Sequence, residues 1–235
     1  MVATATKTTT TMEFVQVDNR NLPLLRKFFD VLWNNFAETE MDNWDLWVEE
    51  ADWSEENMTK TRSKKLAVVA LDERKNVVGG TCWEYFRESQ HYLFSFLYVG
   101  DGGRGRGLGL RLGIKTWKIA EKLEREHGHR FSHLFCEMHD PSKIELDSDS
   151  IDPLDRIRMF SHMGVKLVKG MEYFQPPLHK GDKPQPMIFG IVLTPRVRLD
   201  SDGSPYIPRE QLVGFLSDYY HDLLGGGYEK DPTFQ

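Results

Sequence analysis

Cysteine and long apolar runs are both scarce in this sequence. Only Cys82 and Cys136 occur among its 235 residues, and each stands inside an apolar run, which predicts two buried thiols. Small secreted domains are rich in disulfides, so this usage suits a reducing compartment, and we expect a cytoplasmic protein. The sequence has no run of about eighteen apolar residues, so we expect no transmembrane helix and no membrane partner. Residues 1–11 contain no apolar stretch that would make them a secretory signal.

Positive charge is in deficit as well. Lysine and arginine number 30 against 36 aspartates and glutamates, which gives a formal net charge of −6. Because nucleic-acid binding depends on surplus cationic charge, we expect no nucleic-acid partner. The surplus of carboxylates produces a weak long-range attraction for cationic substrates.

Metal-binding patterns are missing too. His127 and His129 stand near a predicted helix end and have no partners at the spacing of a zinc site. Asp147, Asp149 and Asp152 alternate along a polar segment, but the glycine and the final bidentate glutamate of a calcium loop are absent. We therefore expect no metal.

Strand-like and helix-like segments make up most of the chain. Short turns separate three consecutive strands before residue 100, which predicts an antiparallel meander. The expected strands are Glu13–Val17, Leu66–Leu71, Val77–Phe86, Tyr92–Val99, Phe131–Met138, Val165–Val168 and Met187–Leu193. The expected helices are Leu22–Trp33, Trp44–Trp53, Leu110–His127, Asp152–Gly164 and Pro208–Leu224.

These segments predict a single α/β domain at residues 13–195, with a mixed, mostly antiparallel central sheet and helices on both faces. We expect residues 1–12 to be a disordered N-terminal tail. Residues 196–235 are expected to form a C-terminal extension with one helix, between a linker and a loose tail at 225–235. The polar run Ser54–Lys65 follows the second expected helix. The prolines of Tyr173–Pro177 exclude this segment from a central strand.

One glycine-rich turn carries the functional argument. The turn Arg104–Gly109 follows an apolar strand and opens a long amphipathic helix. Such a position collects unpaired backbone N–H groups, and the helix dipole adds positive potential there. Glycines let the backbone approach an anion closely, and Arg104 and Arg106 add charge. The turn therefore predicts a phosphate or pyrophosphate site.

Two common phosphate motifs fit this turn poorly. A Walker A loop ends in Gly-Lys-Ser/Thr, which is absent. Gly100, Gly102 and Gly105 do form a G-x-G-x-x-G pattern, with Glu124 and Glu126 roughly twenty residues beyond. That dinucleotide motif requires a parallel βαβ unit, whereas the strand before this turn ends an antiparallel meander.

A third interpretation is a resemblance. The strand end Leu97-Tyr98-Val99, followed after four residues by Arg104-Gly105-Arg106-Gly107-Leu108-Gly109, closely resembles the signature of the GNAT acetyltransferases, in which a hydrophobic strand runs into R/Q-x-x-G-x-G/A. The order of strands and helices from Glu13 to Pro195 matches this superfamily as well. The resemblance implies acetyl-CoA as acyl donor.

The resemblance also implies where the cofactor lies. The backbone amides of Arg106 to Leu110 would hold the pyrophosphate, and the backbone around Leu97–Val99 would pair with the pantetheine amides as an added strand does. The thioester would lie where strand Tyr92–Val99 splays apart from strand Phe131–Met138. The expected cofactor-binding residues are Leu97, Tyr98, Val99, Arg104, Gly105, Arg106, Gly107, Leu108, Gly109, Leu110 and Phe160.

The sequence offers two carboxylates as candidates for the general base. Amine acylation needs a general base, which many family members supply as a glutamate on the strand before the turn. Strand Tyr92–Val99 carries no carboxylate, so this sequence departs from that pattern. The remaining candidates are Glu84 and Glu137, because a carboxylate among apolar neighbours is costly unless it is used or paired. His139 is a candidate for shaping the amine pocket or relaying a proton.

This sequence also departs from the family pattern at the acid that protonates the thiolate. Many relatives carry a tyrosine four residues before a glycine of the next helix, where this chain has Phe160 before Gly164. Phenylalanine cannot donate a proton, so Phe160 is expected to pack on the coenzyme. Tyr173 is a candidate substitute.

The function that the sequence predicts is acyl-CoA-dependent acylation of the amine of a small molecule. The tryptophan-rich segment Trp44–Trp53 and the loop Pro141–Ile151 favour a small substrate, because both can enclose one. Two alternatives stay open: acylation of a protein or peptide amine, and a non-catalytic module that binds acyl-CoA. The C-terminal helix, which is additional to the core fold, offers a surface for a homodimer contact.

Overall fold

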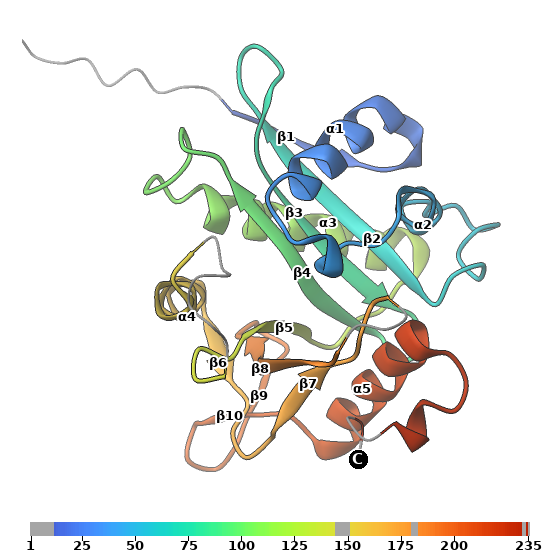
Figure 1. The fold of residues 1–235 in the computed structure, drawn as a ribbon, viewed down its shortest axis with the longest axis vertical. Helices are drawn as coiled ribbons and strands as arrows, with labels where there is room; N and C mark the ends of the chain where they lie inside the picture. Colours follow the sequence, from blue (N-terminus) through green and yellow to red (C-terminus); the bar gives the residue numbers. More distant parts are fainter. Residues whose placement is uncertain (1–11, 144–150, 180–182, 232–233, 235) are drawn as a thin grey trace, which may run out of the picture.

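A single large β-sheet organises the computed structural model, which describes residues 12–143, 151–179, 183–231 and 234. Its strands follow the order β1-β2-β3-β4-β5-β8-β6, and β7 also pairs with β8 (Figure 1). Among these described strands β4 and β5 are parallel, and the other neighbours are antiparallel. The bounds are β1 Glu13–Val17, β2 Ser63–Leu71, β3 Val77–Phe86, β4 His91–Val99, β5 Leu134–His139, β6 Val165–Leu167, β7 Tyr173–Gln175 and β8 Gln185–Val192.

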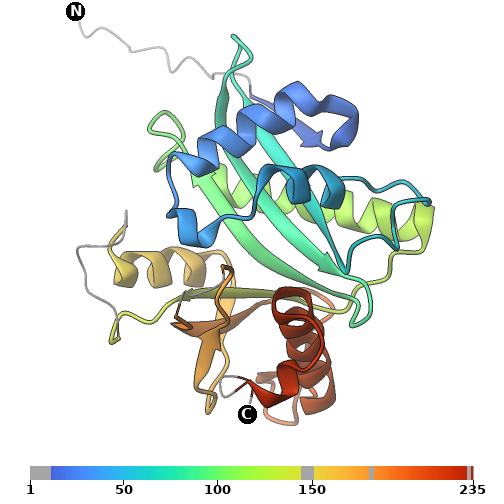
Figure 2. The same cartoon turned by 45° about the vertical axis from the view of Figure 1, so that its right-hand side comes forward.

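Helices cover both faces of this sheet, as the sequence predicts. One face carries α1 (Leu22–Trp33), α2 (Trp44–Glu50) and, lower down, α5 (Arg209–Leu224); the other carries α3 (Leu108–His127) and α4 (Pro153–His162). Figure 2 shows α1 and α2 in front of the sheet and α3 behind it. We call these the α1/α5 face and the α3/α4 face.

The close approach of helices to the sheet depends on two glycines of β3. A Cβ atom on Gly79 would lie 2.9 Å from the Leu108 side chain of α3, and one on Gly80 would overlap the ring of Phe28 on α1. Because neither glycine has a Cβ, α3 and α1 can pack directly on opposite faces of the same strand.

Several boundaries differ from the sequence-based prediction. β2 begins at Ser63 rather than Leu66, because Lys64 and Lys65 are buried within the strand and hide its start in a polar run. α2 ends at Glu50, so Trp53 lies beyond the helix, where its indole donates to the Lys65 carbonyl oxygen. β5 begins at Leu134, since Phe131 packs against Trp117 outside the ladder.

The described C-terminal residues contain more secondary structure than the sequence predicts. The predicted linker at 195–205 leads into a two-stranded ribbon of β9 (Arg198–Leu199) and β10 (Pro205–Tyr206). The tail predicted to be loose forms the short helix η4 (Tyr228–Lys230), and Phe234 packs against Tyr220 and Tyr228. Contacts between these aromatic rings pack Tyr228 and Phe234 against α5.

β7 is a strand although Pro176 and Pro177 follow it, and it pairs with β8 near the end of that strand, so the exclusion of Tyr173–Pro177 from a central strand holds. The expected tail at residues 1–12 lies outside the described residues except for Met12, as do Asp147 and Asp149. Among the described helices, none combines the length and apolar character needed to cross a bilayer.

A buried histidine makes folding sensitive to acid. His91 is 3% exposed beside Phe135 and His133. Burial, and secondarily His133, lowers the pKa of His91 from 6.5 to about 4. Between these pH values His91 is protonated in the unfolded chain but neutral in the folded chain. The free energy of unfolding therefore decreases as the pH falls, by up to about 3 kcal/mol.

We therefore expect His91→Phe to flatten the pH dependence of unfolding between those two pKa values. Denaturant titrations of both proteins across this pH range measure the difference between their free energies of unfolding. Buried carboxyls with raised pKa values contribute equally to both proteins, so their opposing effect cancels in this difference. Parallel curves for the two proteins would show that His91 is not the acid-sensitive group.

Candidate active site

The parallel strands β4 and β5 separate part of the way along their length. They pair at Tyr92–Leu134, Leu93–Phe135 and Phe94–Cys136, and the described pairing ends there. On its other side β4 skips Ser95, because Phe94 opposes Trp83 while Phe96 opposes Cys82. Such a bulge bends a strand and increases its twist. The sheet therefore opens from Phe94 onward, as the resemblance stated above implies (Figure 1).

The turn before α3 presents free backbone donors on the α3/α4 face. Gly107 is the N-cap, at φ 70° and ψ 18°, and its carbonyl oxygen accepts from the Arg111 N–H. The N–H groups of Leu108, Gly109 and Leu110 form no hydrogen bond within the part of the chain that the structure describes. An added Cβ on Gly107 would meet nothing within 4 Å. This open, donor-lined cradle fits a phosphate group.

The residues around the cradle divide between the two faces. Leu97 and Val99 pack with the cluster of the α3/α4 face, and Gly109 sits over Leu97, where an added Cβ would be 3.3 Å from its side chain. Tyr98 points to the α1/α5 face, so its side chain lies away from the cradle. Arg104 and Arg106 are exposed, and so is Leu110, while Leu108 is buried. Gly105 also has φ above zero and open space over it.

Phe160 lies close to where the strands part. It projects from α4, is 8% exposed, and its ring meets that of Phe94 edge-on at 5.5 Å. Since Phe94 belongs to the last β4–β5 pair, Phe160 packs at the closed end of the opening on the α3/α4 face.

Glu137 lies on the other face. It follows Cys136, the last β5 residue paired with β4, and its side chain joins the α1/α5 face. Glu137 Oε2 accepts from the Tyr173 hydroxyl at 2.5 Å, and Oε1 accepts from Gln175 Nε2 and the Tyr219 hydroxyl, both at 3.0 Å. Burial raises the pKa of Glu137 to about 7, although the two tyrosine hydrogen bonds act to lower it. A carboxyl of this pKa can exchange a proton near neutral pH.

Glu84 is tied into an ion-pair cluster on the same face, across β4 from Glu137. Lys65 is 1% exposed and its Nζ lies 2.8 Å from Asp42, 2.5 Å from Glu50 and 3.1 Å from Glu84. Burial raises the pKa of Glu84 to about 7, and Lys65 opposes that shift. Because Lys65 already partners Glu84, this carboxyl is engaged in structure.

Tyr173 is brought to Glu137 and not to Phe160. Its ring belongs to the buried cluster on the α1/α5 face, whereas Phe160 belongs to the cluster on the opposite face. Burial, and then Glu137, raises the pKa of the Tyr173 hydroxyl well above its usual value. The structure thus joins two residues that the sequence marked separately.

Sequence reasoning missed Gln175, Tyr219 and Lys65. Tyr219 falls on the apolar side of α5 and resembles an ordinary core residue, while Gln175 sits in a short segment next to prolines. Lys65 ends the polar run Ser54–Lys65, just before the expected strand at Leu66. These three residues share one signal, which is that burying a polar side chain is costly unless it has a partner. The sequence does not show which side chains are buried, so it could not reveal them.

On the α1/α5 face, contacts of the short helix η2 (Glu38–Glu40) reduce access to the opening between β4 and β5. This helix lies in the segment between α1 and α2 and approaches β5, where Glu40 Oε1 lies 3.6 Å from His139 Nε2. The Glu38 carbonyl oxygen is 3.2 Å from His179 Nε2, in the loop after β7. These contacts place His139 at the edge of the site.

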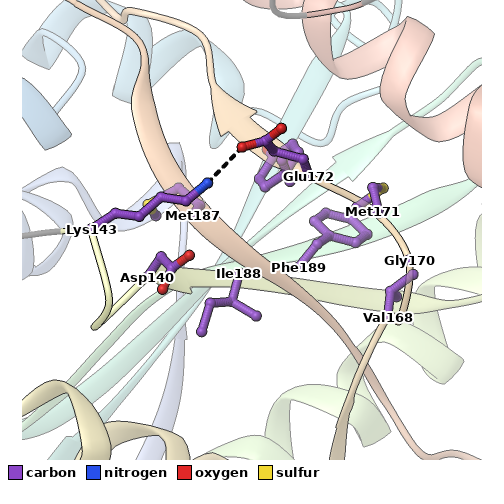
Figure 3. Close-up of a pocket in the computed structure, with 10 residues that line it drawn as sticks. Asp140, Lys143, Val168, Gly170, Met171, Glu172, Met187, Ile188 and Phe189 are labelled. Atoms are coloured by element: carbon purple, nitrogen blue, oxygen red, sulfur yellow. Dashed lines mark hydrogen bonds and ion pairs between the residues drawn. The ribbon is translucent and has the colours of Figure 1, made fainter.

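A separate cavity of about 300 Å³ lies along β8 between β6 and β7 (Figure 3). Lys143 and Glu172 form an ion pair at its mouth, at 2.7 Å. Its lining includes Tyr173 but neither the glycine-rich turn nor Glu137, so we do not place the reaction there.

No family model matches the sequence, and no curated protein matches it. Among solved structures, one from Bacteroides thetaiotaomicron assigned to the GNAT family of acetyltransferases is 16% identical, with a TM-score of 0.59 over 91% of this chain and 98% of that chain. An aminoglycoside 6'-N-acetyltransferase in complex with coenzyme A is 16% identical, with a TM-score of 0.48 over 84% and 98% of the two chains. The first of these similarities shows a shared fold.

Proposed function

We propose that this chain, which has the fold of the GNAT acetyltransferases, is an acyl-CoA-dependent N-acyltransferase that transfers an acetyl group to the amine of a small molecule. One observation carries the proposal: one opening in the sheet has a donor-lined cradle on one face and the half-buried carboxylate of Glu137 on the other. A donor bound on the α3/α4 face and an amine bound on the α1/α5 face would meet there.

The residues around the cradle suit coenzyme A. The amides of Leu108, Gly109 and Leu110 would bind its pyrophosphate, and Arg104 and Arg106 would add charge at the exposed rim. The edge of β4 beyond Phe94, which does not pair with β5, offers backbone groups to the pantetheine amides. When bound, acetyl-CoA supplies an activated thioester, whose acyl group is the one transferred.

Glu137 is the proposed general base. It takes the proton that the acceptor nitrogen loses as the C–N bond forms, and the sulfur, as the C–S bond breaks, takes a proton from water. Tyr173 and Phe160 do not protonate the sulfur in this scheme, because the Tyr173 hydroxyl is held by Glu137 and Phe160 has none. Tyr173 instead orients the base.

The α1/α5 face suits a cationic acceptor. Asp42, Glu50, Glu84 and Glu137 outnumber the one buried cation of the cluster, Lys65, and this surplus attracts an ammonium group. The contacts of η2 with His139 and His179 narrow this face, which favours a small molecule over a protein amine. A non-catalytic acyl-CoA-binding module is the second candidate, because β4 carries no carboxylate.

A thiol-release assay with acetyl-CoA and a panel of mono- and diamines tests the function. We expect release that depends on the amine, with the acylated product confirmed by mass spectrometry. Binding of coenzyme A in calorimetry without release from any amine or peptide would support the non-catalytic module instead.

A further inference from the structure

The C-terminal helix α5 reaches the candidate base. Tyr219 of α5 donates to Glu137 Oε1 at 3.0 Å and accepts from Gln175 Nε2 at 3.2 Å, while Gln175 also donates to Oε1. Each group uses its hydrogens in one direction: the amide to the hydroxyl and the carboxylate, and the hydroxyl to the carboxylate. The orientation of the Gln175 amide follows, since an ionised carboxylate only accepts.

These bonds leave the two carboxylate oxygens unequal. A carboxylate offers about four acceptor positions, two on each oxygen. Gln175 and Tyr219 fill both positions on Oε1, whereas Tyr173 fills one on Oε2. Within the described residues the remaining acceptor position therefore belongs to Oε2.

The helix that carries Tyr219 is firmly placed. Asp218 accepts from Arg62 Nη2 at 3.0 Å and from the Ser89 N–H at 2.9 Å, and Asp222 is 3.0 Å from Ser63 Oγ. Asp218 and Asp222 thus bind α5 to the start of β2 and to the turn before β4. Such outer support fixes the geometry of the residue it carries.

From this geometry we infer that Tyr219 and Gln175 are positioning residues: they saturate Glu137 Oε1 and so direct proton transfer from the amine to Oε2. The inference rests on the proposed function, and it makes the C-terminal helix α5 part of the catalytic apparatus.

The charges around Glu137 set the direction of the test. Glu84 of β3 and Glu40 of η2 raise the pKa of Glu137, and the hydroxyls of Tyr173 on β7 and Tyr219 on α5 lower it. His139, on β5 itself, lies beside Glu40. Removing the Tyr219 hydroxyl takes away a hydrogen bond to the ionised form, so the pKa of Glu137 must rise.

The test compares Tyr219→Phe with Tyr220→Phe, a neighbour on α5 whose hydroxyl binds the Phe174 carbonyl oxygen instead of Glu137. Carboxyl-carbon NMR titration of the free protein, with the Glu137 resonance identified by its loss in Glu137→Gln, needs no substrate. From the starting value of about 7, we expect an upward shift of about one pH unit in Tyr219→Phe and none in Tyr220→Phe. The acid limb of the pH profile of kcat/KM should shift by the same amount in Tyr219→Phe. At neutral pH the kcat/KM of this variant should be about fivefold lower than that of wild type, and at alkaline pH the two values should converge.

Three outcomes would overturn the inference. An unchanged Glu137 titration would show that Tyr219 does not hold the carboxylate. A shifted titration with a fixed acid limb would show that the contact is only structural. A shifted titration without thiol release from any amine would mean that the proposed function itself fails. Should Tyr219→Phe not fold, Gln175→Met removes donors to the same oxygen and must shift both readouts in the same direction.

Discussion

Glu137→Gln lowers kcat by about 10²–10⁴-fold, the contribution typical of a general base. The substitution keeps the shape of the side chain. Its single amide oxygen can accept from the Tyr219 hydroxyl while its NH2 group donates to the Tyr173 hydroxyl oxygen, so the loss falls on proton transfer rather than on folding. Steady-state thiol release with an identified amine measures the effect. Coenzyme A affinity should stay unchanged, because the cradle lies on the opposite face.

Glu84→Gln is the matched comparison, since burial raises the pKa of both carboxyls to about 7 on the same face. We expect a lower stability, because Lys65 loses one of its three carboxylate partners, but less than about tenfold loss of kcat. A large rate loss in Glu84→Gln together with wild-type turnover in Glu137→Gln would reverse the assignment. Wild-type turnover in both would leave proton removal to water or His139.

Most of the fold was predictable because local patterns decide it. The meander β2–β4, the long α3 and the strand–helix order after it follow from alternation, period and turn residues, and the expected mixed sheet with helices on both faces is confirmed. The errors fall where tertiary contacts override local pattern. Lys64 and Lys65 look like a loop but form the start of β2, because the carboxylates of Asp42, Glu50 and Glu84 neutralise Lys65.

The candidate site was predictable on the α3/α4 face, whereas on the α1/α5 face the sequence marked Glu137 and Tyr173 but not their contact. The cradle is a local feature of consecutive residues, so its glycines and its helix start appear directly in the sequence. The environment of Glu137 is assembled from β5, β7 and α5, and its partners Tyr173, Gln175 and Tyr219 are 36, 38 and 82 residues away. The local periodicity of a sequence cannot predict contacts between residues so far apart along the chain.

Gly107→Val weakens coenzyme A binding by about 100-fold or more, equivalent to ~3 kcal/mol. The space over Gly107 is open, so the added side chain would occupy the cradle itself. It would separate an anion from the N–H groups of Leu108 and Gly109, and hydrogen bonds to charged groups contribute about 1.5–3 kcal/mol each. Calorimetric titration with coenzyme A measures the effect independently of any acceptor.

Backbone strain is the competing explanation, because valine at the Gly107 φ of 70° costs of order 1–3 kcal/mol by itself. Gly203→Val separates the two effects. Gly203 has φ 76° and equally open space around it, but it lies in the turn between β9 and β10. Both variants should lose similar stability in denaturant, while only Gly107→Val should lose coenzyme A. Equal affinities in the two variants would mean that the turn at Arg104–Gly109 does not hold the pyrophosphate, and that the cofactor placement on the α3/α4 face is wrong.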